Sequence, residues 1–283
     1  MQAAVGTRLT CVRTVVRRYV RRYEVRFLSR TRGRTCVHTK RSSQEVVIAE
    51  RFLGCHGVVQ LRDAFFCAMP KPAWCLVYDL HESSLKTLLE HTDRVADPLG
   101  CSDAFGSCRC ILVGLLSIHK VGFTNADIKP DNILVQARGH GPPSCGHGPR
   151  WTAVIADLGC AVEAPSDARE KVQAGGALKM QTLWWRAPEI LFGDEKFDFS
   201  VDVWSLGLVF CELAGSRFHM GHASKAQYLK ALCGQLGSPD GTAVAKLSGY
   251  PASGVPSTGR KAWPARTFTM VGSSGYELLD KML

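Results

Sequence analysis

The stretch IHKVGFTNADIKPDNILV, residues 118–135, is the part of this chain that decides its fold. Asp127, Lys129 and Asn132 stand close together directly before an apolar run, 133–135, that predicts a short strand. A single Asp at a strand end most often only caps a turn. Taken alone, this cluster therefore favours turn capping, although a carboxylate flanked by a Lys and an Asn also offers the oxygen ligands that Mg²⁺ prefers.

Two further polar clusters follow along the chain. The sequence DLG, 157–159, comes directly after a second predicted strand, 153–155, and TLWWRAPEIL occupies 182–191. Phosphoryl transfer needs an acceptor for the proton of the attacking hydroxyl, oxygen ligands for magnesium and a cation near the moving phosphate. Either Asp cluster alone would favour turn capping, whereas the three clusters in this order favour phosphoryl transfer.

At these residues the sequence resembles the protein kinases. Residues 118–135 resemble the kinase catalytic loop, DLG the magnesium-binding motif, and APE, 187–189, the end of the activation segment. DVWSLG, 202–207, resembles the central buried helix of the large lobe. TLWWRAPEIL and QLGSP, 235–239, are similar to the cyclin-dependent kinase and MAP kinase branch, often written CMGC.

The resemblance implies an α+β, two-lobed protein kinase-like fold with a small β-rich N-lobe and a larger helical C-lobe. We expect a basic segment at 1–41 and a kinase-like domain at 42–283, with a hinge near 78–82 and the helical lobe at 83–283. The chain ends before the family's last segment, so the resemblance predicts a C-terminally truncated helical lobe.

The resemblance also implies a serine/threonine kinase that uses ATP and Mg²⁺. Asp127 would take the proton of the substrate hydroxyl and Lys129 would steady the γ-phosphate. Asn132 and Asp157 would hold magnesium, and Thr182 would bridge to Asp127. Ser/Thr specificity rests on Lys129 in DIKPDN, which resembles the loop of Ser/Thr kinases.

For the nucleotide, the resemblance places Tyr78 at the gatekeeper position, with Asp79 and His81 offering a backbone carbonyl and N–H to adenine. Counting from the family's spacing, Arg26 stands where a strand lysine should pair with Glu45. A second interpretation of Glu45 stays open, because Ser-x-x-Glu at 42–45 is also the spacing of a helix capping box.

Several departures from the family pattern keep a second function open. Residues 1–20 contain one glycine, so no glycine-rich phosphate loop is visible, and Arg26 replaces the lysine. These departures favour a pseudokinase, a binding or scaffold module without catalysis. Asn125-Ala126 replaces the family's His-Arg, and Ala177 stands at the usual phospho-acceptor. Our hypothesis is that such a kinase is not switched on by phosphorylation there, because both halves of the charge-assisted contact are missing.

The net charge of +10 is a local feature. Residues 1–41 hold 12 Lys and Arg and one acid, a net charge of +11, whereas the remaining chain holds 23 bases and 24 acids. Solvated strands, an organelle transit peptide and an arm that binds nucleic acid or acidic membrane all remain open for this segment. The 12 cysteines show no CxxC pair, which argues against structural zinc and favours reduced thiols in an intracellular protein, cytoplasmic or nuclear.

No apolar run reaches the length of a membrane span. Expected partners are a protein substrate and a cyclin-like or other regulatory protein. Expected secondary structure comprises three helices, four strands and two loops, namely helices 42–53, 105–119 with Leu112, Leu115, Leu116 and His119 on one face, and 201–213; strands 58–61, 74–78, 133–135 and 153–155; and loops 137–150 and 248–274.

Overall fold

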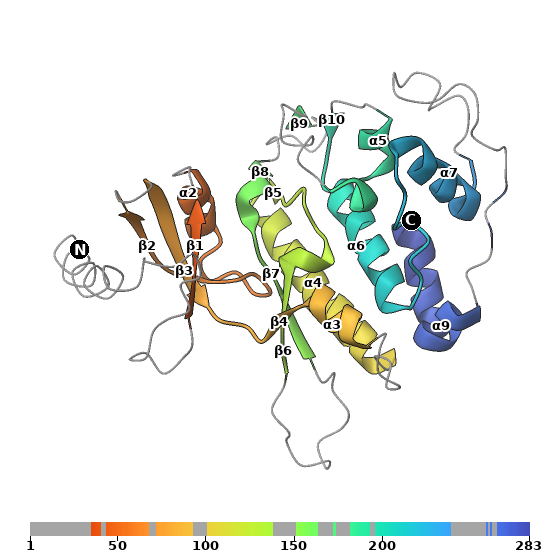
Figure 1. The fold of residues 1–283 in the computed structure, drawn as a ribbon, viewed down its shortest axis with the longest axis horizontal. Helices are drawn as coiled ribbons and strands as arrows, with labels where there is room; N and C mark the ends of the chain where they lie inside the picture. The colour runs from red at the N-terminus through yellow and green to blue at the C-terminus, as the bar shows by residue number, and fades with distance from the viewer. Residues whose placement is uncertain are drawn as a thin grey trace, which may run out of the picture. The chain divides into compact units, whose positions relative to one another are not determined.

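The computed structural model describes residues 35–40, 44–67, 72–92, 101–137, 151–163, 172–173, 182–192, 196–238, 259, 261 and 265–283. The chain divides into two compact units, 1–54 with 59–80, and 55–58 with 81–283. We call them the small and the large unit. Both helices and strands occur in each, so the chain is α+β, as predicted (Figure 1).

The small unit contains a three-stranded antiparallel sheet and one helix. Its elements are β1 Thr35–Lys40, α2 Gln44–Arg51, β2 Leu61–Cys67 and β3 Ala73–Asp79. The strand order is β1-β3-β2, so β3 is central and pairs with both neighbours (Figure 1). β1 lies inside the predicted basic segment 1–41, so the end of that segment is a strand.

Helix α2 packs its apolar stripe on one face of this sheet. Val46 and Ala49 bury against Leu76 of β3, with Trp74 and Tyr78 packed beside them. Because side chains alternate along a strand, Leu76, Trp74 and Tyr78 share one face and the residues between them point to the other face.

The large unit contains short sheets and the longer helices. Its elements are β4 Ser83–Ser84, α3 Leu85–Thr92, α4 Cys101–Lys120, β5 Phe123–Thr124, η1 Pro130–Asn132, β6 Ile133–Ala137, β7 Trp151–Ile155, η2 Leu158–Cys160, β8 Val162–Glu163, β9 Val172–Gln173, η4 Leu183–Trp185, α5 Pro188–Leu191, β10 Lys196–Phe197, α6 Ser200–Leu213, α7 Lys225–Leu236 and α9 Ala265–Met282. The site depends chiefly on the antiparallel pair β6–β7 and on α6.

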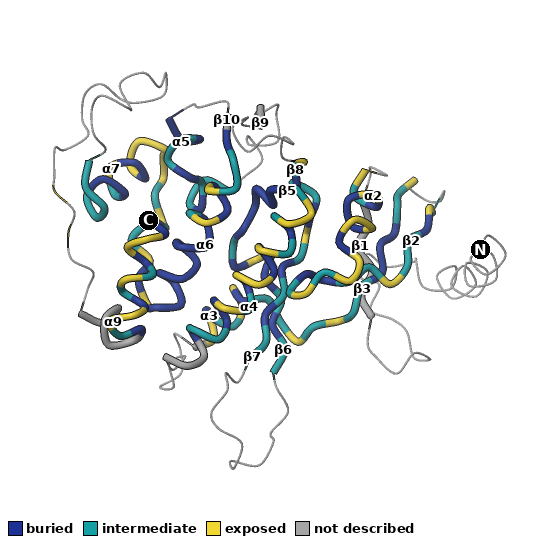
Figure 2. Tube along the Cα trace, turned by 180° about the vertical axis from the view of Figure 1, so that it is seen from behind, coloured by how far each residue is buried: buried dark blue, intermediate teal, exposed yellow. Residues whose placement is uncertain are grey.

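Helix α6 is the buried centre of the large unit. Eleven of its 14 residues are buried, in agreement with the all-round apolar sequence of the predicted helix 201–213 (Figure 2). Asp202, in its first turn, is fully buried, and its carboxylate accepts hydrogen bonds from the backbone N–H groups of Asn125 and Ala126, both at 2.8 Å. His119 of α4 lies 2.8 Å from the same carboxylate. Helix α6 thereby holds the loop that precedes Asp127.

Two of the predicted elements were wrong in detail. The strand predicted at 58–61 begins instead at Leu61, and Val58 forms only an isolated parallel bridge with Ile155. The tail predicted as mostly loop at 248–274 contains the first ten residues of α9, in which Gly272 forms a kink with a φ of 64°. The predicted loop 137–150 lies, apart from Ala137, outside the described residues.

Helix α4 is present as predicted, but its buried face differs. Leu112 and Leu116 are 36% and 54% exposed, whereas Ile111, Leu115 and Ile118 are buried. Leucines on both sides of the helix made the apolar face ambiguous in the sequence, and packing on β7 selects the stripe that contains Ile111 (Figure 2). Within the described ranges, none of the helices is both long and apolar enough to cross a membrane.

A close backbone approach fixes α4 against the segment before β2. Gly57, at a φ of 73°, sits so close to Gly114 that a Cβ on Gly57 would lie 2.6 Å from the Gly114 backbone nitrogen. We expect Gly114→Ala to lower the free energy of unfolding by about 1–3 kcal/mol, because its methyl would meet the Gly57 carbonyl. Urea unfolding measures this change.

The matched control is Gly234→Ala in α7, where a Cβ would meet nothing within 4 Å. Both substitutions gain the same helix propensity, about 0.5–1 kcal/mol, so the difference between them isolates the close approach. Equal stabilisation by both would contradict the packing described for α4.

The contacts of Asp202 generate a second prediction. Asp202→Asn leaves at least one buried backbone N–H without an acceptor, so we expect the free energy of unfolding to fall by about 1–3 kcal/mol. Asp131→Asn is the control, because Asp131 pairs with Lys86 at 2.8 Å in an exposed ion pair, and such pairs contribute about 0–1 kcal/mol. Thermal or urea unfolding of both variants compares them, and equal losses would show that Asp202 does not anchor the loop.

Candidate active site

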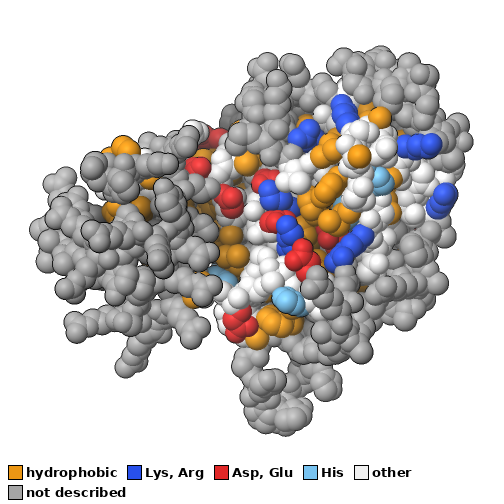
Figure 3. All heavy atoms as spheres, in the orientation of Figure 1, with side chains coloured by type: hydrophobic (Ala, Val, Ile, Leu, Met, Phe, Trp, Pro, Cys, Tyr) orange, Lys and Arg blue, Asp and Glu red, His pale blue; other side chains and the backbone are white. Residues whose placement is uncertain are grey.

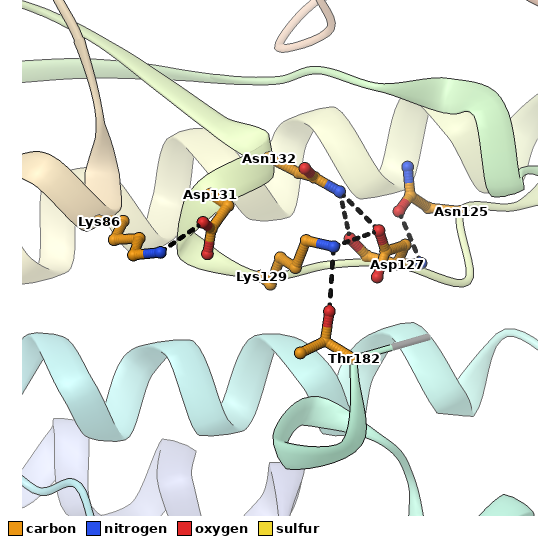
Figure 4. A network of polar contacts seen from close by, with 7 residues as sticks. All are labelled: Lys86, Asn125, Asp127, Lys129, Asp131, Asn132 and Thr182. Atoms are coloured by element: carbon orange, nitrogen blue, oxygen red, sulfur yellow. Dashed lines mark hydrogen bonds and ion pairs between the residues drawn. The ribbon is translucent and has the colours of Figure 1, made fainter. Parts of the chain in front are cut away.

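Asp127 is the centre of a polar network in the large unit (Figure 4). Its Oδ2 accepts hydrogen bonds from Lys129 Nζ at 2.7 Å and from Asn132 Nδ2 at 2.8 Å. Asn132 Nδ2 also donates to the Asp127 backbone carbonyl at 3.0 Å. The side chain of Asp127 is only 9% exposed, so it is held in one orientation by charge-assisted contacts.

Lys129 connects Asp127 to the segment that carries Thr182. Its Nζ lies 3.0 Å from Thr182 Oγ1, and the hydroxyl oxygen accepts because an ammonium has only donors (Figure 4). The sequence predicted a bridge from Thr182 to Asp127. The structure brings the two together through Lys129, which contacts both, and shows Thr182 directly before η4.

Asn125 is a functional residue that the sequence analysis treated only as a departure. Its Oδ1 accepts the backbone N–H of Asp127 at 3.0 Å, while its own N–H donates to Asp202. This side-chain-to-backbone contact spans two residues and is a local turn that Asn favours. Between them Ala126 has a φ of 62°, a left-handed conformation that is uncommon outside glycine. Asn125 and Asp202 together hold that bend.

Ala126 is buried in an apolar cluster rather than exposed to a charged partner. It packs with Ala187, Ile190, Phe197 and Val201 from the segments around α5 and α6. This position carries an Arg in the family pattern, and here a methyl group fills it. The catalytic loop therefore contacts the segment around Ala187 through apolar packing.

Asp157 is placed by the pairing of β6 with β7. Ile133 pairs with Ile155 in the antiparallel register, and the Ala156 N–H donates to the Asn132 carbonyl at 2.8 Å. The beginning of β6 and the end of β7 therefore meet at one end of the hairpin. This brings the segments of Asn132 and Asp157 side by side. Asp157 is exposed, with a left-handed φ of 51°.

These two residues fit the predicted magnesium site in their chemistry. Asn132 uses its amide nitrogen on Asp127, which directs its amide oxygen away from that carboxylate, and Asp157 adds a carboxylate. Mg²⁺ is usually held by one or two such protein oxygens together with substrate phosphates and water. In the described part of the chain, no group of three or more His, Cys, Asp or Glu side chains could hold a metal without such help.

Acidic and basic side chains lie close together on the face of the molecule drawn in Figure 3, with hydrophobic side chains beside them. Lys86 and Asp131 form an exposed ion pair, and the Asp131 carboxylate faces Lys86 rather than Asp127 (Figure 4). Hydrogen bonding to Asp131 raises the pKa of Lys86. Asp131 is thus a neighbour of the site without being part of its network.

The segment after Thr182 is fastened by contacts that the sequence did not reveal. Trp185 Nε1 donates to buried Glu212 at 2.9 Å, and the Trp185 carbonyl accepts from Ser205 Oγ at 2.7 Å. The hydroxyl of Tyr228 donates to the Trp184 carbonyl at 2.8 Å, and burial raises the pKa of that hydroxyl, so it stays a donor. The sequence offered only a weak signal, a second acidic residue in a largely apolar helix that also contains Asp202.

The predicted nucleotide residues lie in different units. Tyr78 and Asp79 end β3 in the small unit, where the Asp79 carboxylate accepts a two-pronged contact from Arg62, with Nε at 2.9–3.0 Å. His81 belongs to the large unit. Glu45 lies in the first turn of α2, partly buried.

Other residues of the predicted nucleotide site are not described. Arg26, the glycine-poor segment 1–20 and Ser42 lie outside the described residues. The pairing of Glu45 with Arg26, its alternative as a helix cap and the hinge roles of Tyr78, Asp79 and His81 therefore stay predictions.

Comparison with curated proteins finds several relatives of similar sequence. The chain is 28% identical to cyclin-dependent kinase 7 of Dictyostelium discoideum, over 80% of this chain and 56% of that protein. It is 31% identical to cell division control protein 2 homolog 2 of Trypanosoma brucei brucei, over 72% of this chain and 57% of that protein, and 27% identical to mitogen-activated protein kinase MPS1 of Pyricularia oryzae, over 86% and 56%. The chain spans about half the length of these relatives.

Comparison with solved structures supports the fold. A chain of the CAK complex of Chaetomium thermophilum, solved with ATP-gamma-S, matches with a TM-score of 0.70 and 24% identity, covering 88% of this chain and 76% of that one.

The family model of the protein kinase domain matches residues 6–256 of this chain. This match begins well before residue 42, the approximate start that the motifs indicated. This chain therefore belongs to the protein kinase family, with a two-lobed α+β kinase fold and relatives in its cyclin-dependent kinase and MAP kinase branch.

Proposed function

We propose that this protein transfers the γ-phosphate of ATP to Ser or Thr hydroxyls of protein substrates. The observation that carries the proposal is the buried Asp127 carboxylate, oriented at 2.7 Å by Lys129 and at 2.8 Å by Asn132. A general base acts only when its oxygen is held within hydrogen-bond reach of the proton it takes. Within the described residues, this network contacts the Asp127 side chain through Oδ2 and leaves Oδ1 available to the substrate hydroxyl.

Each residue of the network has one role in the proposed reaction. Asp127 accepts or orients the proton of the substrate hydroxyl, and the Lys129 ammonium, which already links Asp127 to Thr182, offsets charge on the phosphoryl group as it moves. Thr182 begins the segment against which the substrate would lie. This division of roles is supported by the lengths of the contacts and by the burial of Asp127.

Asn132 and Asp157 would hold Mg²⁺, and Mg-ATP when bound supplies the phosphoryl group and neutralises its charge. The nucleotide roles of Tyr78, Asp79 and His81 belong to the same proposal. Their support is the family membership and the ATP-gamma-S of the related CAK complex structure.

Partners and location are proposed from the same relatives. A cyclin-type regulatory partner is supported by the names of the cyclin-dependent kinase relatives and the CAK complex. We place the protein in the cytoplasm or nucleus on the basis of its cysteine usage. Nucleic-acid binding or organelle import would depend on residues 1–41, of which only 35–40 are described.

The pseudokinase alternative has no support among the described residues. It was based on segment 1–20 and Arg26, which lie outside them, whereas the described catalytic loop keeps Asp127, Lys129 and Asn132 in contact. The test of the proposed function therefore separates catalysis from binding.

The central prediction concerns Asp127→Asn. We expect kcat for phosphorylation of a Ser/Thr protein substrate to fall by about 10²–10⁴-fold, because the amide cannot take the hydroxyl proton. Mg-ATP should still raise the melting temperature of the variant, because ligands stabilise the state that they bind. Radiolabelled phosphate transfer and thermal shift measure the two quantities.

Asp131→Asn is the matched control, four residues along the same loop, because its carboxylate faces Lys86. It should keep wild-type turnover. Equal turnover by wild type and Asp127→Asn would contradict the proposed role. Thermal stabilisation by Mg-ATP with no turnover in the wild type would support a pseudokinase.

A second prediction concerns phosphorylation of the activation segment. Ala126 packs among apolar side chains and offers no cation to a phosphate, and the usual acceptor position is Ala177, which lies outside the described residues. We expect phosphatase treatment to leave kcat unchanged, because no charge-assisted contact is lost. Mass spectrometry confirms dephosphorylation, and loss of activity after treatment would show that another phosphate switches the enzyme on.

A further inference from the structure

Two cysteine thiols of the small unit lie in contact on neighbouring strands. Cys67 is the last residue of β2 and Cys75 lies in the middle of β3, with 3.6 Å between their sulfur atoms. Both are free thiols. The register pairs Phe65 with Cys75 and Cys67 with Ala73, so the two cysteines are diagonal neighbours.

The diagonal arrangement places both thiols on one face of the sheet. Cys67 stands two residues beyond Phe65, and side chains two apart point the same way. This face is opposite the one on which α2 packs, since α2 contacts Leu76 and Trp74 of β3. Helix α2 therefore does not separate or cover the pair.

The two thiols differ in their access to solvent. Cys75 is 5% exposed, whereas Cys67 is partly exposed at the strand end. Burial, together with the contact to Cys67, raises the pKa of the Cys75 thiol to about 12. A small reagent therefore reaches Cys67 first, and Cys75 reacts afterwards from within the sheet, because the thiolate is the nucleophile.

We propose that Cys67 and Cys75 are a site of reversible oxidation by low-molecular-weight disulfides such as oxidised glutathione, and that they form an intrachain disulfide. The Cys67 thiolate attacks one sulfur of oxidised glutathione, a mixed disulfide forms, and one glutathione thiolate leaves and takes up a proton. Cys75 gives its proton to solvent, its thiolate attacks the Cys67 sulfur, and the second glutathione thiolate leaves. Two protein thiols are oxidised, and one oxidised glutathione is reduced to two glutathione molecules.

The geometry makes the second step local. The sulfurs must approach from 3.6 Å to a bond length of about 2.05 Å. Cys67 is at the end of β2, and with Ala73 it forms the last residue pair of the β2–β3 ladder. The movement therefore disturbs one terminal pair and leaves the pairs nearer Tyr78 in place.

The chain offers a direct readout. No Lys or Arg lies between Arg62 and Lys86 except Lys71, which precedes Pro72 and resists trypsin, so both cysteines fall in the single tryptic peptide 63–86. The full chain is incubated with oxidised glutathione, unfolded, alkylated and digested. We expect peptide 63–86 to be lighter by two hydrogen atoms and to carry no alkyl group, and reduction should restore two alkylatable thiols.

Variants separate the two steps. Cys75→Ser should stop at Cys67 carrying one glutathionyl group, and Cys67→Ser should leave Cys75 unmodified. Cys110→Ser, which removes a partly exposed cysteine of α4, should leave disulfide formation unchanged. Thermal unfolding checks that each variant is folded. Disulfide formation in the wild-type chain tests the proposal even if a variant does not fold.

The rate adds a chemical test. Below the Cys75 pKa, conversion of the mixed disulfide to the intrachain disulfide should accelerate about tenfold for each pH unit, because the thiolate fraction rises by that factor. Two alkylated cysteines in peptide 63–86 of the wild type after treatment would overturn the proposal. A stable glutathionyl group on wild-type Cys67, identical to that of Cys75→Ser, would also overturn it.

Discussion

The candidate active site depends on one buried carboxylate, that of Asp202, which accepts hydrogen bonds from two backbone N–H groups. Asp202 is inaccessible to solvent, so its charge is tolerable only because Asn125, Ala126 and His119 satisfy it. Hydrogen bonds to a charged group contribute about 1.5–3 kcal/mol each. That is of the size needed to hold Ala126 in a left-handed conformation, which non-glycine residues adopt at a cost of about 1–3 kcal/mol. The bend then presents Asp127 to its partners.

The end of the β6–β7 hairpin that carries Asn132 and Asp157, the two proposed magnesium ligands, is fixed by strand pairing rather than by chain length. The antiparallel ladder of β6 and β7 runs from the pair of Ile133 with Ile155 to the pair of Ala137 with Trp151. The long connection between the two strands follows Ala137. Asn132 and Asp157 lie at the opposite end. The five residue pairs of the ladder therefore lie between the ends of segment 138–150 and the end that carries Asn132 and Asp157, and added loop length costs little free energy.

Prediction from the sequence succeeded where a residue's chemistry determines its place. The charged residues 127–132 and the apolar run 201–213 have few alternative environments, and both lie where they were expected. It failed where several arrangements bury equal apolar area, as on α4, with leucines on both faces. It also missed Asn125 as a support of Asp127, because in the sequence Asn125 is visible only as a mismatch with the family pattern. The hydrogen bond appears only when the backbone bends.

Helix α6 sets the spacing between the loop that carries Asp127 and the segment that carries Trp185. Asp202 near its beginning anchors the loop of Asp127, and Glu212 near its end anchors Trp185. Ten residues of α-helix separate them by about 15 Å, and because α6 is buried along this length, the spacing cannot change without disrupting the core. Asp202 and Glu212, together with Ser205, which donates to the Trp185 carbonyl, thus fasten both segments to this largely apolar helix. A rigid helix with one carboxylate near each end therefore holds the Asp127 loop and the Trp185 segment in a fixed relation.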